Sequence, residues 1–276
     1  MTRFSRVLSL SAVVTAAALA TAGCSAADED AAPGTTAGSQ GDTSWVDVQE
    51  AGVLVVGTEG TYRPFSFHED GSGDLVGYDV EVIQAVADEL GVDVEFQETQ
   101  WDAIFAGLEA GRFDVIANQV SITPDREESY TFTEPYTVSN GVVVVRADDD
   151  SISSFEDLDG KTTAQSLTSN WYKLAQQSGA QVEAVEGWAQ AVALVEQQRV
   201  DATINDKLTF LDYAQSNDAS GLKVAAETTD QSFSAFALAQ GHDELAGAID
   251  EALATLAADG TLTDLSEKYF GADVSR

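Results

Sequence analysis

The chain has 276 residues, of which 47 are Asp or Glu and 13 are Lys or Arg, so its formal net charge is −34 at pH 7. This excess of negative charge argues against nucleic acid and against anionic lipid surfaces as partners, because both would repel the protein. A hydrophobic content of 44% is ordinary for a globular protein, and the length suits one large or two small domains.

Residues 1–23 are typical of an export signal. Arg3 and Arg6 give the segment a charged start, and the apolar or small residues at 7–20 form a run too short for a membrane span of roughly 20 residues. We therefore expect residues 1–23 to be a signal peptide and the mature chain to lie outside the cytoplasm.

The only cysteine of the chain, Cys24, directly follows the small residues Thr21, Ala22 and Gly23. A lone cysteine at this place resembles a bacterial lipobox, in which the thiol receives an acyl lipid such as palmitate, although Thr21 stands where Leu is usual. This resemblance predicts a lipoprotein anchored on the outer face of the cell membrane. The alternative is cleavage nearby by ordinary signal peptidase, with Cys24 incidental.

The segment 24–44 is expected to be a flexible tether between the lipid and a folded domain. Residues 25–43 are small or polar, with one Pro and no large apolar side chain, so burial cannot offset their conformational entropy. No later apolar run is long enough to span a bilayer, so we expect membrane contact through the lipid anchor only.

The folded part begins with an alternation of strands and helices. The apolar run 53–57 suits a buried parallel strand, and a polar turn with glycines between 66–68 and 75–77 suggests a hairpin. We expect Asp79 to be the N-cap of a helix that Gly91 ends. A parallel βαβαβ unit is predicted from segments 53–57, 79–90, 92–96, 101–110 and 113–117.

An anion site is predicted just after the third strand of this unit. Pro124 suits the first turn of a short helix with Thr123 as its N-cap, so Arg126 lies beside free backbone N–H groups. Its guanidinium is a planar fork that can bind a carboxylate through two parallel hydrogen bonds. The alternative is a surface Arg126 in an ion pair with Asp125 or Glu128.

The loop after the strand 53–57 is a second candidate for ligand contacts. Open α/β sheets bind ligands beyond the carboxyl ends of their strands, and Glu59, Tyr62 and Phe65 follow such an end. For Tyr62 and Phe65, simple packing under the loop is the alternative.

The second half of the chain repeats the alternation, which predicts an α/β fold throughout. Ser169 is expected to cap one of its helices. The predicted strands are 162–164, 182–185, 200–205 and 232–239. The predicted helices are 170–178, 188–198, 208–215, 242–258 and 262–269.

One motif resembles a known family. The segment Gly77–Val82, followed by Val86, Ala87 and Leu90, matches the signature of bacterial extracellular solute-binding proteins, family 3, the polar amino-acid receptors of ABC importers. The resemblance covers about residues 47–271. Its register also agrees at 62–65, 121–126, 132–136 and 262–270.

The resemblance implies a two-lobe, periplasmic-binding-protein-like (type II) fold with a hinge of two crossing strands. Lobe 1 would comprise residues 45–138 with 235–276, and lobe 2 residues 139–234. The implied function is to bind a polar amino acid between the lobes and deliver it to the permease of an ABC importer. We expect a monomer that needs no cofactor or metal.

The resemblance also implies a clamp for a zwitterion. Arg126 would bind the α-carboxylate together with Ser121, and the N–H groups of Ser169 and Asn170 would add donors. Asp206 would accept from the α-ammonium. Its alternative is an N-cap of the next helix, and both roles can hold because a carboxylate has two oxygens. Since neither charge would be matched across an empty cleft, an open resting state is expected.

The remaining implied contacts hold the side chain of the ligand. Tyr62 and Trp101 would enclose it between aromatic faces, and Glu59 and Gln119 would line its far end. The segment 164–170 resembles the lobe-2 loop of cystine-type receptors. Only Glu59 offers an inward acidic group, so cystine or another neutral polar amino acid is favoured over a basic one.

Two other function classes stay open at this point. Some cyclohexadienyl dehydratases resemble the same fold, and a catalytic interpretation would make Glu59 the acid or base. A sensory ligand domain is the second alternative, against which stands the lack of a later membrane span or signalling domain. Turnover of prephenate or arogenate would separate an enzyme from a receptor.

Overall fold

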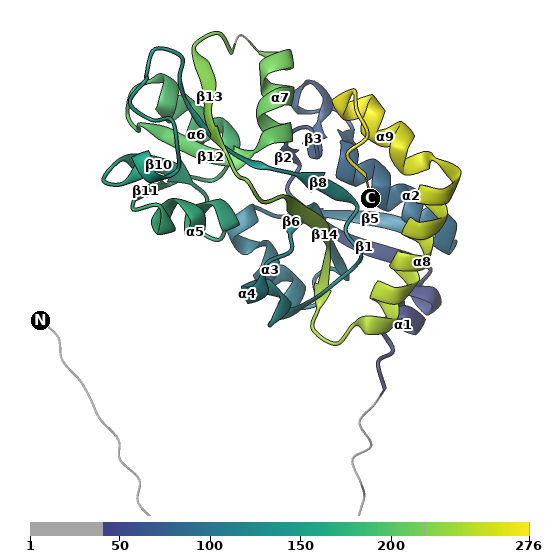
Figure 1. Ribbon diagram of the computed structural model, residues 1–276. Coiled ribbons are helices and arrows are strands. Elements are labelled where there is room, and N and C mark those ends of the chain that lie inside the picture. Colours follow the sequence, from purple (N-terminus) through teal and green to yellow (C-terminus); the bar gives the residue numbers. More distant parts are fainter. Residues whose placement is uncertain (1–40, 218, 276) are drawn as a thin grey trace, which may run out of the picture. The chain divides into compact units, whose positions relative to one another are not determined.

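Two separate sheets organise the part of the chain that the computed structural model describes, residues 41–217 and 219–275 (Figure 1). We call the elements around the first sheet lobe 1 and those around the second lobe 2. The first sheet has the strand order β5 (Asp93–Glu98), β1 (Val53–Thr58), β6 (Val115–Ser121), β14 (Ser232–Ala239) and β7 (Tyr130–Phe132), with β8 (Thr137–Ser139) also paired to β14. The second has the order β11 (Gln181–Ala184), β10 (Thr162–Gln165), β12 (Ala202–Asp206), β9 (Gly141–Arg146) and β13 (Leu222–Glu227).

The parallel strands predicted at the start of lobe 1 are present, and the strand–helix alternation predicted for lobe 2 forms the same arrangement. In lobe 1, β1 pairs in parallel with both β5 and β6. In lobe 2, β10 pairs in parallel with both β11 and β12. The carboxyl ends of parallel strands share one edge of a sheet, so the ends of β1 and β6 lie together in lobe 1, and those of β10 and β12 lie together in lobe 2.

Helices cover the sheets on both faces. Lobe 1 contains α1 (Ser44–Ala51), α2 (Tyr78–Leu90), α3 (Trp101–Glu109), α4 (Pro124–Glu127), α8 (Asp243–Asp259) and α9 (Thr261–Phe270). Lobe 2 contains α5 (Asn170–Gln177), α6 (Trp188–Glu196) and α7 (Lys207–Ser216). Short 3₁₀ turns lie at Glu69–Gly71 and Glu156–Leu158, and β2 (Thr61–Tyr62), β3 (Ser66–His68) and β4 (Leu75–Val76) form a small antiparallel sheet.

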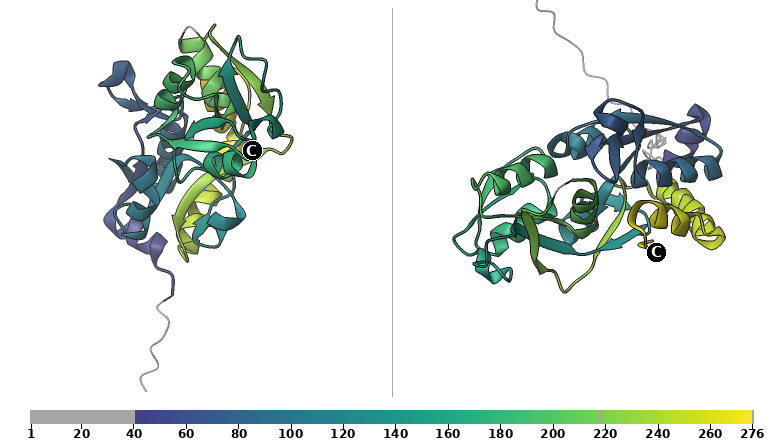
Figure 2. Two further views of the ribbon diagram at one scale, coloured as in Figure 1. Left: turned by 90° about the vertical axis from the view of Figure 1, so that its left-hand side faces the viewer. Right: turned by 90° about the horizontal axis from the view of Figure 1, so that it is seen from above.

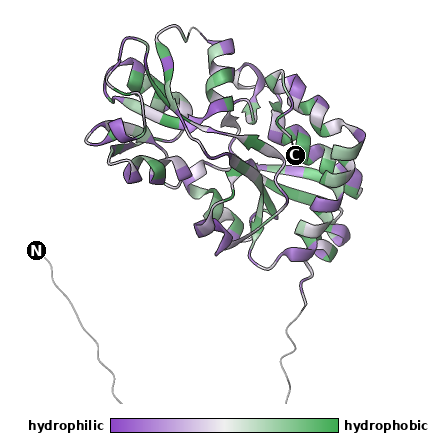
Figure 3. Ribbon diagram, viewed as in Figure 1, coloured by the Kyte–Doolittle hydropathy of each residue, from purple (hydrophilic) through white to green (hydrophobic). Residues whose placement is uncertain are grey.

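The buried apolar side chains follow this layering. In lobe 1, Tyr78, Ile83 and Phe236 belong to the core between the sheet and α2, α8 and α9, while Ile104 and Phe113 belong to the core on the α3 side. The strands of both sheets are accordingly mostly hydrophobic, and the helices carry hydrophilic outer faces (Figure 3). No helix of the described residues is long and apolar enough to cross a membrane.

Two chain passages connect the lobes. The first runs from β8 through Asn140 into β9, and the second runs from β13 to β14. As a result, both ends of the described chain belong to lobe 1, and the middle forms lobe 2 (Figure 2). The lobe boundaries at 138/139 and 234/235 stay predictions. The two passages form the hinge expected of a fold with crossing strands.

One predicted cap is wrong. Gly77, not Asp79, is the N-cap of α2, and it adopts φ of 137°. A Cβ at Gly77 would lie 2.2 Å from the carbonyl oxygen of Phe65, so a side chain has no room there. Asp79 is buried in the first turn, where its carboxylate accepts from the main-chain N–H of Gln119 at 2.5 Å. The true partner is 40 residues away in the sequence, which local capping rules cannot detect.

Candidate functional site

A cavity of about 290 Å³ lies between the two lobes. The loop after β1, the second half of β6 and the start of α3 line it from lobe 1, and the ends of β10 and β12 with the starts of α5 and α6 line it from lobe 2. Six of the nine predicted ligand-binding residues belong to the lining: Glu59, Tyr62, Trp101, Gln119, Ser169 and Asn170. The other three, Ser121, Arg126 and Asp206, do not line it.

Arg126 is a buried cation beside the cavity. It lies in α4, where Thr123 is the N-cap as predicted and Pro124 opens the helix. Its Nη1 donates to the carbonyl oxygen of Ser121 at 2.9 Å, and its Nη2 donates to that of Thr168 in lobe 2 at 3.3 Å. Its guanidinium carbon lies 5.3 Å from the centroid of the Trp101 ring, which lines the cavity.

No described carboxylate pairs with Arg126. The expected alternative of a surface pair fails, because Arg126 is only 8% exposed and Asp125 instead forms an ion pair with Lys173. Burial lowers the pKa of Arg126 to about 10. A buried charge is usually paired, so this guanidinium is suited to a carboxylate that a ligand brings.

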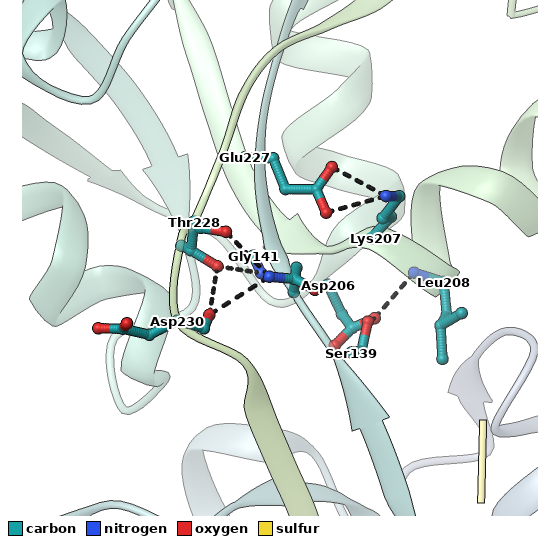
Figure 4. Close-up of polar contacts among 9 residues, drawn as sticks. Ser139, Gly141, Asp206, Lys207, Leu208, Glu227, Thr228 and Asp230 are labelled. Carbon is teal, nitrogen blue, oxygen red and sulfur yellow. Dashed lines mark hydrogen bonds and ion pairs between the residues drawn. The ribbon is translucent and has the colours of Figure 1, made fainter.

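Asp206 is the buried anion of lobe 2. It is the N-cap of α7, with Oδ1 accepting from the Leu208 N–H at 2.8 Å and from the Ser139 hydroxyl at 2.7 Å (Figure 4). The predicted cap is therefore present. Both bonds go to Oδ1, which leaves Oδ2 without a partner among the described residues. Burial raises the pKa of Asp206 to about 6.

The start of α5 differs in part from the expectation. The Ser169 hydroxyl caps the helix by accepting from the Tyr172 N–H at 3.0 Å. The Ser169 N–H donates to the Ser166 carbonyl oxygen at 3.1 Å, so the predicted role of this N–H as a ligand donor is wrong. The Asn170 N–H has no partner among the described residues and stays a candidate donor at a helix N-terminus.

Ser121 ends β6 and is buried. Its hydroxyl accepts from the hydroxyl of Ser232, on β14, at 3.1 Å, and its carbonyl oxygen accepts from Arg126. Ser121 therefore orients the guanidinium through its main chain. A direct contact between its hydroxyl and a ligand stays a prediction.

Gln119 lines the cavity but its side chain is held by its own lobe. Its Nε2 donates to Asp79 Oδ1 at 2.7 Å and to the Thr137 hydroxyl at 3.1 Å. Gln119 also has φ of 50°, which is unusual for a residue other than Gly. Asp79 fixes this backbone by accepting from the Gln119 N–H, so the signature aspartate acts as a positioning residue.

Glu59 lines the cavity at the end of β1. Asn118 holds it twice, since Nδ2 donates to Glu59 Oε2 at 2.7 Å and Oδ1 accepts from the Glu59 N–H at 2.9 Å. Burial raises the pKa of Glu59 to about 7, with Asp102 and Glu186 contributing like charge. No described cation pairs with Glu59, which is the expected inward acidic group.

Tyr62 and Trp101 both line the cavity, but their side chains make different contacts. The Tyr62 hydroxyl donates to Asn205 Oδ1 at 2.9 Å and accepts from the Thr209 hydroxyl at 3.1 Å, so it crosses from lobe 1 to lobe 2. Burial raises the pKa of Tyr62. Trp101 is 8% exposed and packs edge-on against Phe105. Both aromatic rings border the cavity, as predicted for side-chain contacts.

Several lining residues were not anticipated from the sequence. They come from the ends of lobe-2 strands and from the first residues of α5 and α6. The main ones are Gln165, Trp171, Glu186, Trp188 and Asn205. Their position after predicted strands was a usable signal, because ligands of α/β sheets bind at that edge.

The cavity wall holds unsatisfied polar groups. Four lining residues have a buried side-chain nitrogen or oxygen without a partner among the described residues: Trp101 Nε1, Gln119 Oε1, Gln165 Nε2 and Trp188 Nε1. Buried polar groups are otherwise nearly always hydrogen-bonded. This wall is therefore suited to a polar ligand. No group of His, Cys, Asp or Glu within residues 41–217 and 219–275 could hold a metal ion.

Contacts across the cavity bring the lobes together. Besides Tyr62, Asp102 of lobe 1 accepts from both the N–H and the hydroxyl of Thr168 in lobe 2, at 3.1 and 2.9 Å. Arg63 pairs with Asp212 at 3.5 Å. The structure thus describes a closed arrangement of the lobes, and the open resting state expected without ligand stays a prediction.

Comparison with known proteins gives one family. A model of bacterial extracellular solute-binding proteins, family 3, matches residues 54–272. The L-cystine-binding protein TcyA of Bacillus subtilis is 47% identical over 270 residues, which cover 98% of each chain.

Two solved structures are informative about conformation. The L-cystine solute receptor of Neisseria gonorrhoeae in an unliganded open conformation is 46% identical and covers 84% of this chain and 99% of its own, with a TM-score of 0.57. An ancestral arginine-binding protein bound to arginine is only 35% identical, covers 80% and 99%, and reaches a TM-score of 0.75. The less similar sequence superposes better, which agrees with closed lobes in the present structure.

Proposed function

Because this chain belongs to family 3 of the bacterial extracellular solute-binding proteins, we propose that it captures a free L-amino acid between its lobes and delivers it to the permease of an ABC importer. The matched relatives are transport-binding proteins, so the chain is a binding protein and not an enzyme. Its site then needs affinity and release rather than acid–base chemistry.

The observation that carries this proposal is a pair of buried, opposite charges on different lobes. Arg126 in lobe 1 has no anionic partner among the described residues. Asp206 in lobe 2 has no cationic partner among them, and its Oδ2 accepts no hydrogen bond from them. The α-carboxylate of an amino acid would bind Arg126, and its α-ammonium would bind Asp206. One zwitterion therefore neutralises both lobes at once, which favours the closed state.

L-Cystine is the ligand we favour. The relative that matches nearly the full chain is named for L-cystine binding, and so is the 46% identical solved receptor. The polar cavity wall, with its unpartnered donors at Gln165 and Trp188, agrees with a polar and extended side chain.

We also propose that the protein reaches the membrane through a lipid on Cys24 and the tether 24–44. The predicted signal peptide 1–23, Cys24 and residues 25–40 lie outside the described residues, so this part rests on the sequence. The first described helix, α1, begins at Ser44, where the predicted tether ends. A tether of this length would let the folded lobes meet the permease while anchored.

A thermal-shift screen of the twenty amino acids and L-cystine tests the proposal. A ligand that binds only the folded state raises the melting temperature by mass action, by about 2.7 kcal/mol of stability at 100 times Kd. We expect L-cystine to give the largest shift and its dimethyl ester, which lacks free carboxylates, to give none. A shift with a sugar and none with any amino acid would refute the proposal.

A further inference from the structure

A turn before α5 fixes the position of Thr168 in lobe 2. The carbonyl oxygen of Ser166 accepts from both the N–H and the hydroxyl of Ser169, at 3.1 and 2.8 Å. The Ser166 hydroxyl donates to the carbonyl oxygen of Glu186 at 3.2 Å, which ties the turn to the loop before α6. Thr168 lies inside this turn and is exposed. Lobe 2 alone therefore positions its N–H and hydroxyl at the surface.

Asp102 of lobe 1 is the partner of both groups. Its Oδ1 accepts from the Thr168 N–H at 3.1 Å and from the Thr168 hydroxyl at 2.9 Å. Asp102 lies in the first turn of α3, directly after the buried Trp101, where the helix dipole stabilises a carboxylate. Both partners thus belong to ordered elements of different lobes, so little conformational entropy is lost when they meet.

These two hydrogen bonds need no ligand. Neither Asp102 nor Thr168 belongs to the cavity lining, and donors and acceptor are all protein groups. The ion pair of Lys173 with Asp125 also joins the lobes, but it orders a long, exposed lysine side chain, which costs entropy. The Asp102–Thr168 contact is therefore better suited to hold the lobes together.

We propose that Asp102 and Thr168 form a latch that stabilises the closed lobes without touching the ligand, and so sets the affinity for every amino acid by one common factor. Both are positioning residues. Because binding and closure are linked, a contact made only in the closed state raises all affinities equally, whereas a residue that touches the ligand changes them unequally. The effect on affinity rests on the proposed function, but the effect on closure does not.

Thr168→Val is the most informative variant. It removes one of the two bonds, keeps the size of the side chain and leaves every charge in place. Asp102→Ala removes both bonds, but Asp102 also contributes negative charge near Glu59, so this variant alone does not separate the latch from the cavity. Thr263→Val is the matched control, because the Thr263 hydroxyl donates to the carboxylate of Asp273 at 3.1 Å within lobe 1.

The test measures calorimetric affinities and stopped-flow dissociation rates for L-cystine and S-methyl-L-cysteine, which differ in size. Thr168→Val should weaken the binding of both by the same factor of about three, with a matching rise in the dissociation rate. In an Asp102→Ala background the same substitution should have no further effect, since its bond is already absent. Thr263→Val should leave both affinities unchanged.

Small-angle scattering without ligand is a second readout. The variant that combines Asp102→Ala with Thr168→Val should have a larger radius of gyration than wild type and Thr263→Val, because fewer contacts hold its lobes together. Melting temperatures within a few degrees of wild type exclude misfolding as the cause.

Three results would overturn the latch: unchanged affinities in Thr168→Val, unequal factors for the two ligands, or full additivity of the Asp102 and Thr168 substitutions. If no amino acid binds the wild type, the proposed function fails and the scattering comparison alone decides on the latch. In that case, an equal radius of gyration in the combined variant and wild type would overturn it.

Discussion

The guanidinium of Arg126 in lobe 1 donates to the main-chain carbonyl oxygen of Thr168 in lobe 2, over 3.3 Å. The next residue, Ser169, caps α5, so the contact places the N-terminus of that helix beside a buried cation. Asp102 fixes the same Thr168 from lobe 1. Donors from both lobes therefore converge near one point only when the lobes are closed, which links carboxylate binding to closure.

Loss of either charge of the clamp should weaken ligand binding. We expect Arg126→Ala and Asp206→Asn each to weaken L-cystine binding by more than about tenfold, or 1.4 kcal/mol. The reason is that one charge of the ligand is then buried without its partner, which costs roughly 2–5 kcal/mol. Isothermal titration calorimetry measures the effect. Near-wild-type affinity of both variants would remove the clamp from the mechanism.

The structure changes which variant of Asp206 is informative. An Ala variant would remove more than the charge, because Asp206 caps α7. Asp206→Ala should therefore also lose about 1 kcal/mol of stability. Asp206→Asn keeps an oxygen for the Leu208 N–H while it removes the charge. Asp93→Asn, exposed on β5, is the control for a neutralised carboxylate far from the clamp.

The ion pair between Lys173 in α5 and Asp125 in α4 should favour closure. Lys173→Glu places two carboxylates opposite each other across the cleft, so the closed state and the ligand affinity should both fall. Exposed pairs contribute about 0.2–1 kcal/mol, which corresponds to a change of at most about fivefold. Small-angle scattering should show less compaction on ligand addition, and high salt should reduce the difference.

Arg199→Glu is the matched control for this reversal. Arg199 pairs with Glu183 at 3.3 Å within lobe 2, so the change in charge is the same but no contact between the lobes is involved. An equal loss of affinity in both variants would show that net charge, rather than the Lys173 contact, is responsible.

The sequence predicted best what depends on neighbours in the chain. The helix expected at 101–110 is found at Trp101–Glu109, and the Thr123 cap that positions Arg126 is present, because caps and periodicity are local. The helix α1 was missed, since it is short and is secured by a bond from the Leu245 N–H to the Ser44 hydroxyl, about 200 residues away.

The candidate site shows the same division. Residues of the clamp were named through the resemblance to the family, and their roles toward a ligand stay predictions. The roles of Asp79 and of the Ser169 N–H were misjudged, because their partners could be seen only in the folded chain. Gln165 and Trp188 reach the cavity from different elements of lobe 2, a juxtaposition that no local pattern encodes.

Replacement of Cys24 by Ala should release the protein into the medium. The proposed lipid on Cys24 would be the only anchor, and no described helix could replace it. Fractionation of cells that express Cys24→Ala, with wild type beside it, measures the distribution. A Cys24→Ala protein that stays in the membrane fraction would contradict the lipobox, whereas ligand affinity should be the same in both proteins.

The buried carboxylates should give stability and affinity opposite pH trends. Burial raises the pKa of Glu59 and Asp79 to about 7 and that of Asp206 to about 6, against about 4 in an unfolded chain. Between pH 4 and 7 the folded protein therefore binds more protons than the unfolded one. Its free energy of unfolding should rise as the pH falls from 8 to 5, since ∂ΔG/∂pH is negative in this window.

Ligand binding should respond in the other direction. An ammonium group binds the ionised form of Asp206, so affinity should fall as the pH drops below about 6. Melting temperatures without ligand and calorimetric affinities, measured from pH 8 to 5, give both trends. Asp206→Asn should remove the part of the affinity profile that has its midpoint near pH 6. Asp79→Asn should reduce the gain in stability at low pH and leave the affinity profile unchanged. A melting temperature that falls steadily from pH 8 to 5 would show that these carboxylates are ionised and well solvated in the folded protein.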